Sequence, residues 1–201
     1  CLITHASILR AVLDYVMLAK PAAVVVGDAP VQVCHFDKVQ ALGFDRVADY
    51  FRQLGKPVAV KDFRRTTMVR EIHAAQVSEE RRGLDEFVLV DLGTRSQLEP
   101  IAGDFELFRV TMYDPRKLPQ NHRPGMHRYL IARDILEADL VVNVPKLKTH
   151  KKAGLTCALK NLVGINGNKD YLPHHRKGGA DRGGDNYAEA SLPKRLAEAT
   201  L

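Results

Sequence analysis

Apolar residues recur at a helical spacing in two segments near the start of the chain. In residues 4–19 they fall on one face of a helix, and Thr4 or Ser7 is suited to cap its first turn. Residues 36–54 have the same period, with a break expected near Gly43. The pattern predicts two amphipathic helices, the second of them interrupted.

Continuous apolar runs alternate with the helical segments. The β-branched run at residues 22–26 ends at Gly27 and Asp28, and Gly55 separates the second helix from another run at residues 57–62. More strands are expected at residues 86–91, 107–112 and 138–144, more helices at residues 127–137 and 155–163, and a charged loop at residues 78–85. Strands that alternate with helices predict an α/β fold, with a mostly parallel sheet flanked by helices in Rossmann-like layers.

The length of the chain bounds its organisation. A chain of 201 residues suits one domain, so residues 1–201 are expected to form a single α/β domain. The chain begins at Cys1 and ends in the helix-like stretch KRLAEATL, which has no stop signal. We therefore expect a fragment of a longer chain that lacks its N-terminal start and its C-terminal part.

Several classes of protein are disfavoured. The longest apolar runs have about five residues, far short of the ~20 that span a bilayer, so no membrane segment is expected. The three cysteines are scattered, which indicates neither a disulfide framework nor a metal knuckle and favours the cytoplasm. No HExxH, P-loop or CxxC motif occurs, which removes common hydrolase, kinase and zinc-finger interpretations.

A basic segment follows the strand expected at residues 138–144. The net charge is +6, and residues 146–160 hold five lysines and no carboxylate. Because Pro145 cannot continue a sheet, the chain is expected to leave it there, and loops at the ends of parallel strands bind anions. The residues placed on this loop are Lys146, Lys148, Thr149 and His150. The segment predicts a site for phosphate or carboxylate; a solvated basic face is the alternative.

The helix expected after this loop adds candidates. Gly154 permits a close backbone approach, and Lys160 with its neighbour Asn161 follows about two turns into the helix. Crowding by other lysines would favour a neutral Lys160 amine that acts as a base or nucleophile; the alternative is an ordinary surface lysine. Asp28, at the end of an earlier strand, is expected either to bind the ligand or to form an Asx-turn.

A glycine-rich stretch with two adjacent histidines comes next. Lys169 is a further candidate for anion binding, and from a loop both His174 and His175 could reach a metal, an anion or a carboxyl substrate. Histidine with carboxylate suits zinc, nickel, iron or manganese, and no spacing here selects one of them. His174 and His175 are therefore predicted metal ligands, on the condition that they converge with other groups.

These motifs carry a resemblance to a known family. VVVGDAP, NVPKLKTH and GLTCALKNLVG are similar to the DUF362 family of bacterial and archaeal proteins, whose activity is mostly unassigned. The likeness covers nearly the whole chain. Some relatives carry ferredoxin-like iron–sulfur segments, which need clustered cysteines, so the resemblance implies no iron–sulfur cluster here.

A second resemblance is local. The segment from His150 to Lys160 resembles one in nickel-pincer lactate racemases, where a catalytic His is followed by Ala-Gly and then by the lysine that holds the cofactor. By that likeness His150 would be an acid/base and Lys160 would attach a cofactor. The racemases have Ser-Gly-Gly where this chain has Thr156-Cys157-Ala158. The resemblance therefore implies a common fold and site location more than a common reaction.

The leading hypothesis is an enzyme that binds an anionic small molecule or a phosphorylated cofactor, with a divalent metal as a further candidate. Racemase-like or isomerase chemistry and an association with oxidoreductases are the activities considered. Lys146, Lys148 and Lys160 would neutralise the anion and His150 would transfer a proton. The alternatives are a nucleic-acid or other polyanion-binding module and a non-catalytic partner of a redox protein. Aromatic residues make up only 6% and Trp is absent, which disfavours nucleic acid; the oligomeric state is left open.

Overall fold

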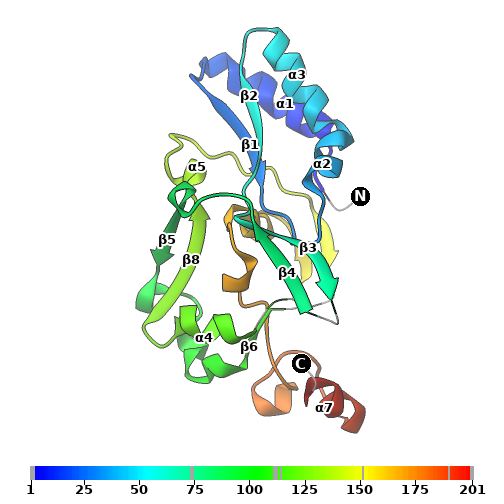
Figure 1. Ribbon diagram of the computed structural model, residues 1–201, viewed down its shortest axis with the longest axis vertical. Coiled ribbons are helices and arrows are strands. Elements are labelled where there is room, and N and C mark those ends of the chain that lie inside the picture. The colour runs from blue at the N-terminus through cyan, green and yellow to red at the C-terminus, as the bar shows by residue number, and fades with distance from the viewer. Residues whose placement is uncertain are drawn as a thin grey trace. The chain divides into compact units, whose positions relative to one another are not determined.

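Two units make up the chain. The computed structural model describes residues 3–72, 75–110, 113, 115–150, 152–189 and 191–199 (Figure 1). Unit 1 comprises Cys1–Met68, Glu79–Phe87 and Ile131–Gly167, and unit 2 comprises Val69–Ser78, Val88–Leu130 and Asn168–Leu201. The basic segment at residues 146–160 therefore lies in unit 1, whereas Lys169, His174 and His175 lie in unit 2.

Unit 1 is built around two parallel strands and the helices that cover one of their faces. β1 (Val24–Asp28) and β2 (Val58–Asp62) pair in parallel, and the register sets Asp28 opposite Asp62. α1 (Ala6–Val16) and α3 (Asp45–Gln53) lie beside these strands (Figure 1). The shared core consists of Leu9, Leu13, Met17, Ala48, Phe51 and Val58. Burying each large side chain contributes about 1.5–3 kcal/mol, which holds the helices on the strands.

Both predicted N-terminal helices are confirmed, with one change at a cap. α1 continues into the short 3-10 helix η1 (Met17–Ala19), and its N-cap is His5, whose Nδ1 accepts the Ser7 N–H. Of the two expected caps, Thr4 donates its hydroxyl to the carbonyl of Val144 instead, and Ser7 lies inside the helix.

The interrupted helix follows the predicted break. It consists of α2 (Phe36–Val39), the π-helical turn η2 (Gln40–Phe44) and α3. Gly43 has φ +115°, a conformation that L side chains rarely adopt, and Gly55 ends the helix with φ +69°.

Hairpins replace several of the predicted elements. β3 (Thr66–Ile72) and β4 (Ala75–Glu80) form one small sheet, and β4 extends into the stretch predicted as a loop. The helix predicted at residues 127–137 is wrong: β7 (His122–Arg123) and β8 (Met126–Ala132) form an antiparallel hairpin, and only α5 (Arg133–Leu136) is helical. Gly125 at φ +76°, after Pro124, supplies the turn that reverses the chain.

The mixed composition of helices and strands is confirmed, whereas a large parallel sheet is not observed. In the described residues each sheet holds two or three strands, and β8 pairs with both β7 and β5 (Phe87–Asp91). Several pairs are antiparallel, so Rossmann-like layers are not confirmed. The strand predicted at residues 138–144 is also wrong, because that stretch joins no sheet.

Unit 2 consists of short elements around a small core. The buried apolar residues are Ala102, Phe108, Leu118, Met126 and Leu130. The other strands and helices of this unit are β6 (Phe108–Arg109), β11 (His175–Arg176), η4 (Gly93–Arg95), η5 (Glu99–Leu107), η6 (Pro115–Lys117), α4 (Leu118–Asn121), η8 (Lys169–Tyr171), η9 (Ala180–Arg182) and α7 (Leu192–Ala199). Of the strand predicted at residues 107–112, β6 forms, and residues 111 and 112 lie outside the described residues. Unit 1 also contains η3 (Leu84–Glu86). Among the described helices none is long and apolar enough to cross a bilayer.

Gly27 is required by a close contact inside unit 1. A Cβ atom at this position would lie 2.0 Å from Cζ of Phe63, whose ring is buried and cannot move aside freely. We predict that Gly27→Ala lowers the free energy of unfolding by about 1–3 kcal/mol, as in other overpacked cores. Gly103→Ala is the control, because a Cβ there meets no atom within 4 Å. Urea unfolding of both variants measures the difference, and equal midpoints would contradict the prediction.

Candidate functional site

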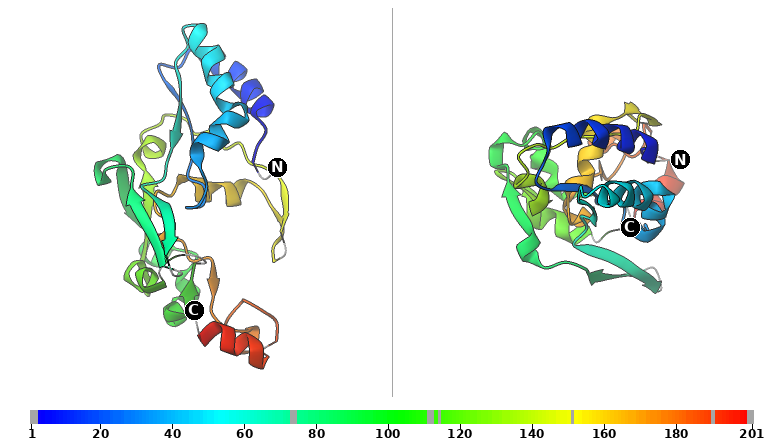
Figure 2. Two further views of the ribbon diagram at one scale, coloured as in Figure 1. Left: turned by 45° about the vertical axis from the view of Figure 1, so that its right-hand side comes forward. Right: turned by 90° about the horizontal axis from the view of Figure 1, so that it is seen from above.

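The basic segment forms a β-hairpin. β9 (Lys148–His150) pairs in antiparallel fashion with β10 (Gly154–Thr156), and the hairpin is the yellow pair of strands in Figure 2. The prediction of an irregular loop is therefore wrong, and the helix predicted at residues 155–163 begins only at residue 158. Gly154 has φ +68°, which lets the chain reverse tightly and pair with itself before any helix starts.

The register of the hairpin sorts its side chains between two faces. Lys148 stands opposite Thr156 and His150 stands opposite Gly154, so these four residues share one face. Thr149 therefore lies on the other face. Gly154 has no side chain, and a Cβ there would meet no atom within 4 Å, so the space beside His150 is open.

The His150 ring is held by its own turn. Its Nδ1 accepts the backbone N–H groups of Lys152 and Ala153, each at 3.2 Å. A nitrogen that accepts hydrogen bonds carries no proton, so the neutral ring is protonated at Nε2. Half-buried His150 therefore presents an N–H donor at Nε2.

The lysines around the hairpin are accessible. Lys146 and Lys160 are exposed, and Lys148 is half-buried. Within the part of the chain that the structure describes, neither Lys146 nor Lys160 belongs to an ion pair. The exposure of Lys160 agrees with the alternative of an ordinary surface lysine.

Lys160 and Asn161 lie on α6 (Ala158–Asn161), a single turn followed by the 3-10 helix η7 (Leu162–Ile165). The amide of Asn161 donates to Oδ1 of Asn143 at 2.8 Å, and the amide of Asn143 donates to the carbonyl of Ala158 at 3.0 Å. This pair of bonds fixes α6 to the stretch just before the hairpin. Among the described residues, no hydrogen bond or ion pair joins Lys160 to His150.

The carboxyl end of β1 meets η7. The N–H of Ala29 donates to the carbonyl of Gly164 at 2.7 Å, and a Cβ on Gly164 would lie 2.0 Å from Oδ1 of Asp28. Asp28 is therefore the last residue of a strand that lies against the turn after α6. The carbonyl of Asp28 accepts the N–H of Phe63 at 2.9 Å, and ligand binding by Asp28 stays a prediction.

A buried arginine forms hydrogen bonds at the carboxyl end of β2. Arg64 is 2% exposed, and its guanidinium donates to the carboxylate of Asp62, with the shortest contact at 2.6 Å. The other Nη atom donates to three main-chain carbonyls of the loop that follows β1, those of Val31, Gln32 and Cys34. Arg64 is thus a structural cation that ties this loop to β2.

The remaining predicted residues lie in unit 2. Lys169 is 5% exposed, and the adjacent Asp170 pairs with Lys117 at 2.7 Å. His174 and His175 have their rings edge to face, with centroids 5.7 Å apart, where β11 pairs with β6. In the described part of the chain no three His, Cys, Asp or Glu side chains converge as a metal site would require. Metal binding by His174 and His175 stays a prediction.

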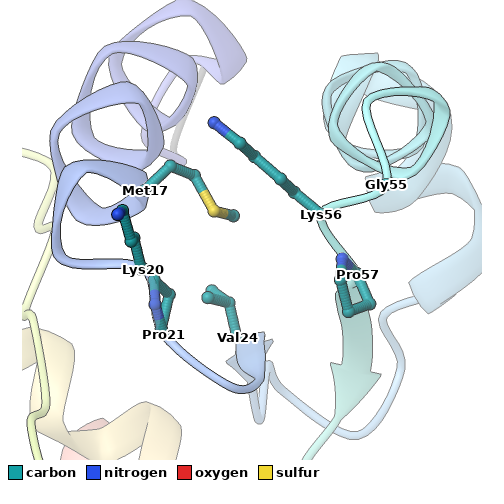
Figure 3. Close-up of a pocket in the computed structure, with 7 residues that line it drawn as sticks. All are labelled: Met17, Lys20, Pro21, Val24, Gly55, Lys56 and Pro57. Atoms are coloured by element: carbon teal, nitrogen blue, oxygen red, sulfur yellow. The ribbon is translucent and has the colours of Figure 1, made fainter.

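A shallow cavity of about 200 Å³ opens at the amino ends of β1 and β2 (Figure 3). Its lining residues are Met17, Lys20, Pro21, Val24, Gly55, Lys56 and Pro57. None of the predicted site residues lines this cavity. Asp28 is at the opposite end of β1.

The sequence did not lead us to predict a buried pair of histidines. His122 and His127 are fully buried and face each other across the β7–β8 hairpin, with their Nδ1 atoms 3.4 Å apart. Pro124-Gly125 is a strong turn signal, and a hairpin centred on it would have placed the two histidines opposite one another. The predicted helix at residues 127–137 concealed this arrangement.

Comparison with known proteins identifies one family. The model of the family described as "Domain of unknown function (DUF362)" matches residues 92–201, which is more than half of the chain. No curated protein and no solved structure matches. The local likeness to lactate racemases therefore stays a prediction.

Burial of His122 makes the stability of the fold depend on pH. Burial is the largest cause that lowers the pKa of His122, from 6.5 to about 4. The folded state therefore prefers the neutral His122 ring, and the contribution of this ring to stability is fully present above pH 6.5 and is lost as the pH falls toward about 4. We predict a loss on the order of 3 kcal/mol over this interval, followed by urea unfolding.

The variant His122→Gln tests this assignment. In the original chain Nε2 of His122 lies 2.6 Å from the carbonyl oxygen of Tyr171. A Gln amide can still donate to that carbonyl but cannot titrate, so the acid-side slope of stability should be shallower. His35→Gln, at an exposed histidine, should keep the slope of the original chain. If His122→Gln retains the full slope, another group is responsible.

Proposed function

The chain belongs to the DUF362 family, and we propose that its basic hairpin binds the phosphate or carboxylate group of a small molecule or cofactor. The observation that carries the proposal is the face shared by Lys148 and His150, on which His150 holds Nε2–H as a donor. Anions are bound by such combinations of N–H donors and positive charge.

The fixed tautomer of His150 supports this proposal. Two backbone N–H groups occupy Nδ1, so a ligand meets a donor at Nε2 without any rearrangement of the ring. The Nε2–H group cannot bind a cation, and it can donate a hydrogen bond to an oxyanion or a carboxylate oxygen. In a reaction, the same Nε2–H would serve as a general acid toward a leaving or carbonyl oxygen.

The charge of the segment supports the same ligand class. Residues 146–160 contain five lysines and no carboxylate, so no side chain within the segment neutralises them. Lys146 precedes the hairpin, Lys148 shares its face with His150, and Lys160 follows on α6. In this proposal the three ammonium groups attract the anion, and Thr149, Gly154 and Asn161 shape its surroundings.

The other predicted residues have subsidiary roles in the proposal. Asp28 positions η7, and thereby α6, through its contact with Gly164. Lys169, His174 and His175 lie in unit 2, and their roles in anion and metal binding stay predictions of their own. In this proposal the hairpin would bind a phosphorylated cofactor or a divalent metal from solution. The proposal does not specify the reaction.

Calorimetric titration with inorganic pyrophosphate tests the proposal. We expect measurable binding that weakens by about tenfold or more in Lys148→Ala, Lys160→Ala and His150→Gln, because each variant loses a charge-assisted or neutral hydrogen bond to the anion. The thermal midpoints should change little, since these side chains are exposed or half-buried. The control is the double variant Lys20→Ala/Lys56→Ala, which removes two exposed lysines from the opposite end of β1 and β2.

Two results would contradict the proposal. One is equal weakening in the control and in the hairpin variants, which would mean that only net charge matters. The other is much tighter binding of a single-stranded RNA oligonucleotide with a steep salt dependence, which would favour a polyanion-binding module. Elemental analysis and intact mass of the purified protein add a check for a bound metal or an adduct on Lys160.

A further inference from the structure

His122 and His127, two buried histidines of unit 2, lie at the centre of a line of hydrogen-bonded groups. Their facing Nδ1 atoms are 3.4 Å apart. On the far side of each ring, His122 Nε2 lies 2.6 Å from the carbonyl oxygen of Tyr171, and His127 Nε2 lies 2.9 Å from Oε2 of Glu99. The line runs through η5, β8, β7 and η8.

The two outer partners determine which ring nitrogens carry protons. A carbonyl oxygen only accepts, so His122 must donate from Nε2. Glu99 accepts the Gly125 N–H on both carboxylate oxygens, at 3.0 and 3.2 Å, and this bond is the largest cause that lowers its pKa. An ionised Glu99 also only accepts, so His127 donates from Nε2 as well.

This assignment leaves a conflict between the rings. Two neutral imidazoles that are protonated at Nε2 each have a lone pair on Nδ1. Those lone pairs would then face each other at hydrogen-bond distance with no proton between them. Both residues are 0% exposed, and buried acceptors without a donor are costly.

We infer that His122 and His127 share one additional proton between their Nδ1 atoms, so that the pair carries one positive charge, balanced by Glu99. All three hydrogen bonds of the line are then made, and its net charge is zero. The proton is assigned to His127, because that ring lies beside the Glu99 carboxylate, and it is donated to Nδ1 of His122.

The other charged and titratable groups around the pair are already engaged. On β5, Asp91 accepts the backbone N–H of His127 at 2.9 Å and pairs with Arg128 at 3.3 Å. On β8, the ring of Tyr129 meets the His122 ring edge-on, with centroids 5.1 Å apart, and burial raises its pKa. Beside Tyr171, Asp170 pairs with Lys117. The balancing charge for the shared proton therefore comes from Glu99.

The shared proton would make the hydrogen bond between His122 and Tyr171 of η8 depend on pH. Without it the opposed lone pairs break the line at its centre, and with a second proton two positive charges face each other at 3.4 Å. The line is complete only when the pair holds one proton. Unit 2 therefore fixes Tyr171, and with it the buried Lys169 and Asp170, most firmly at intermediate pH.

Long-range ¹H–¹⁵N correlation spectra of the ¹⁵N-labelled chain at about pH 7 test the inference. We expect His127 to be protonated on both ring nitrogens and His122 on Nε2 alone. In Glu99→Gln the pair should lose its shared proton at a pH lower by at least about one unit, because the balancing charge is gone. Glu106→Gln removes an exposed carboxylate of the same unit and should leave the titration unchanged.

Three outcomes would overturn the inference. The first is a pair of neutral rings at about pH 7, seen directly in the unmutated chain and so independent of whether Glu99→Gln folds. The second is the same titration in Glu99→Gln and Glu106→Gln. The third is a change in the Nδ1 signals on adding EDTA, which would assign a metal ion to the gap between the rings in place of the proton.

Discussion

The arrangement of unit 1 depends on the burial of one guanidinium group. Arg64 is 2% exposed, so its charge must be neutralised and its N–H groups must be satisfied inside the protein. Asp62 supplies the charge, and the loop after β1 supplies three carbonyls. Because these partners come from the end of β2 and from the loop after β1, one side chain ties the two strand ends together.

The same demand for paired polar groups organises the other candidate sites. Nδ1 of His150 is satisfied by the hairpin turn, which leaves Nε2–H as the group that faces outward. The amide of Asn161 donates to Oδ1 of Asn143, whose own amide donates to the carbonyl of Ala158, and these two bonds position α6. In unit 2, Glu99 is fixed by Gly125 and in turn receives His127. A chemical role is thus assigned to each ring by its hydrogen-bond partners, and the ring's position in the sequence does not specify it.

The predictions of secondary structure failed next to two short turns. Pro124-Gly125 and Gly154 both stand just before a stretch whose apolar spacing also fits a helix, and in both places a hairpin formed. Periodicity alone does not separate these outcomes over a few residues. In the described residues each sheet holds two or three strands, and several of the pairs are antiparallel hairpins of neighbouring strands.

The sequence by itself determined the family motifs, the helices around Gly43, the parallel strands β1 and β2, and the cluster of lysines without carboxylates, since these follow from local periodicity and composition. Tertiary structure decided which groups meet. It set Gly164 against Asp28, exposed Lys160, and buried His122 against His127. Burial and hydrogen-bond partners come from segments far apart along the chain, and no local pattern of residue types records them.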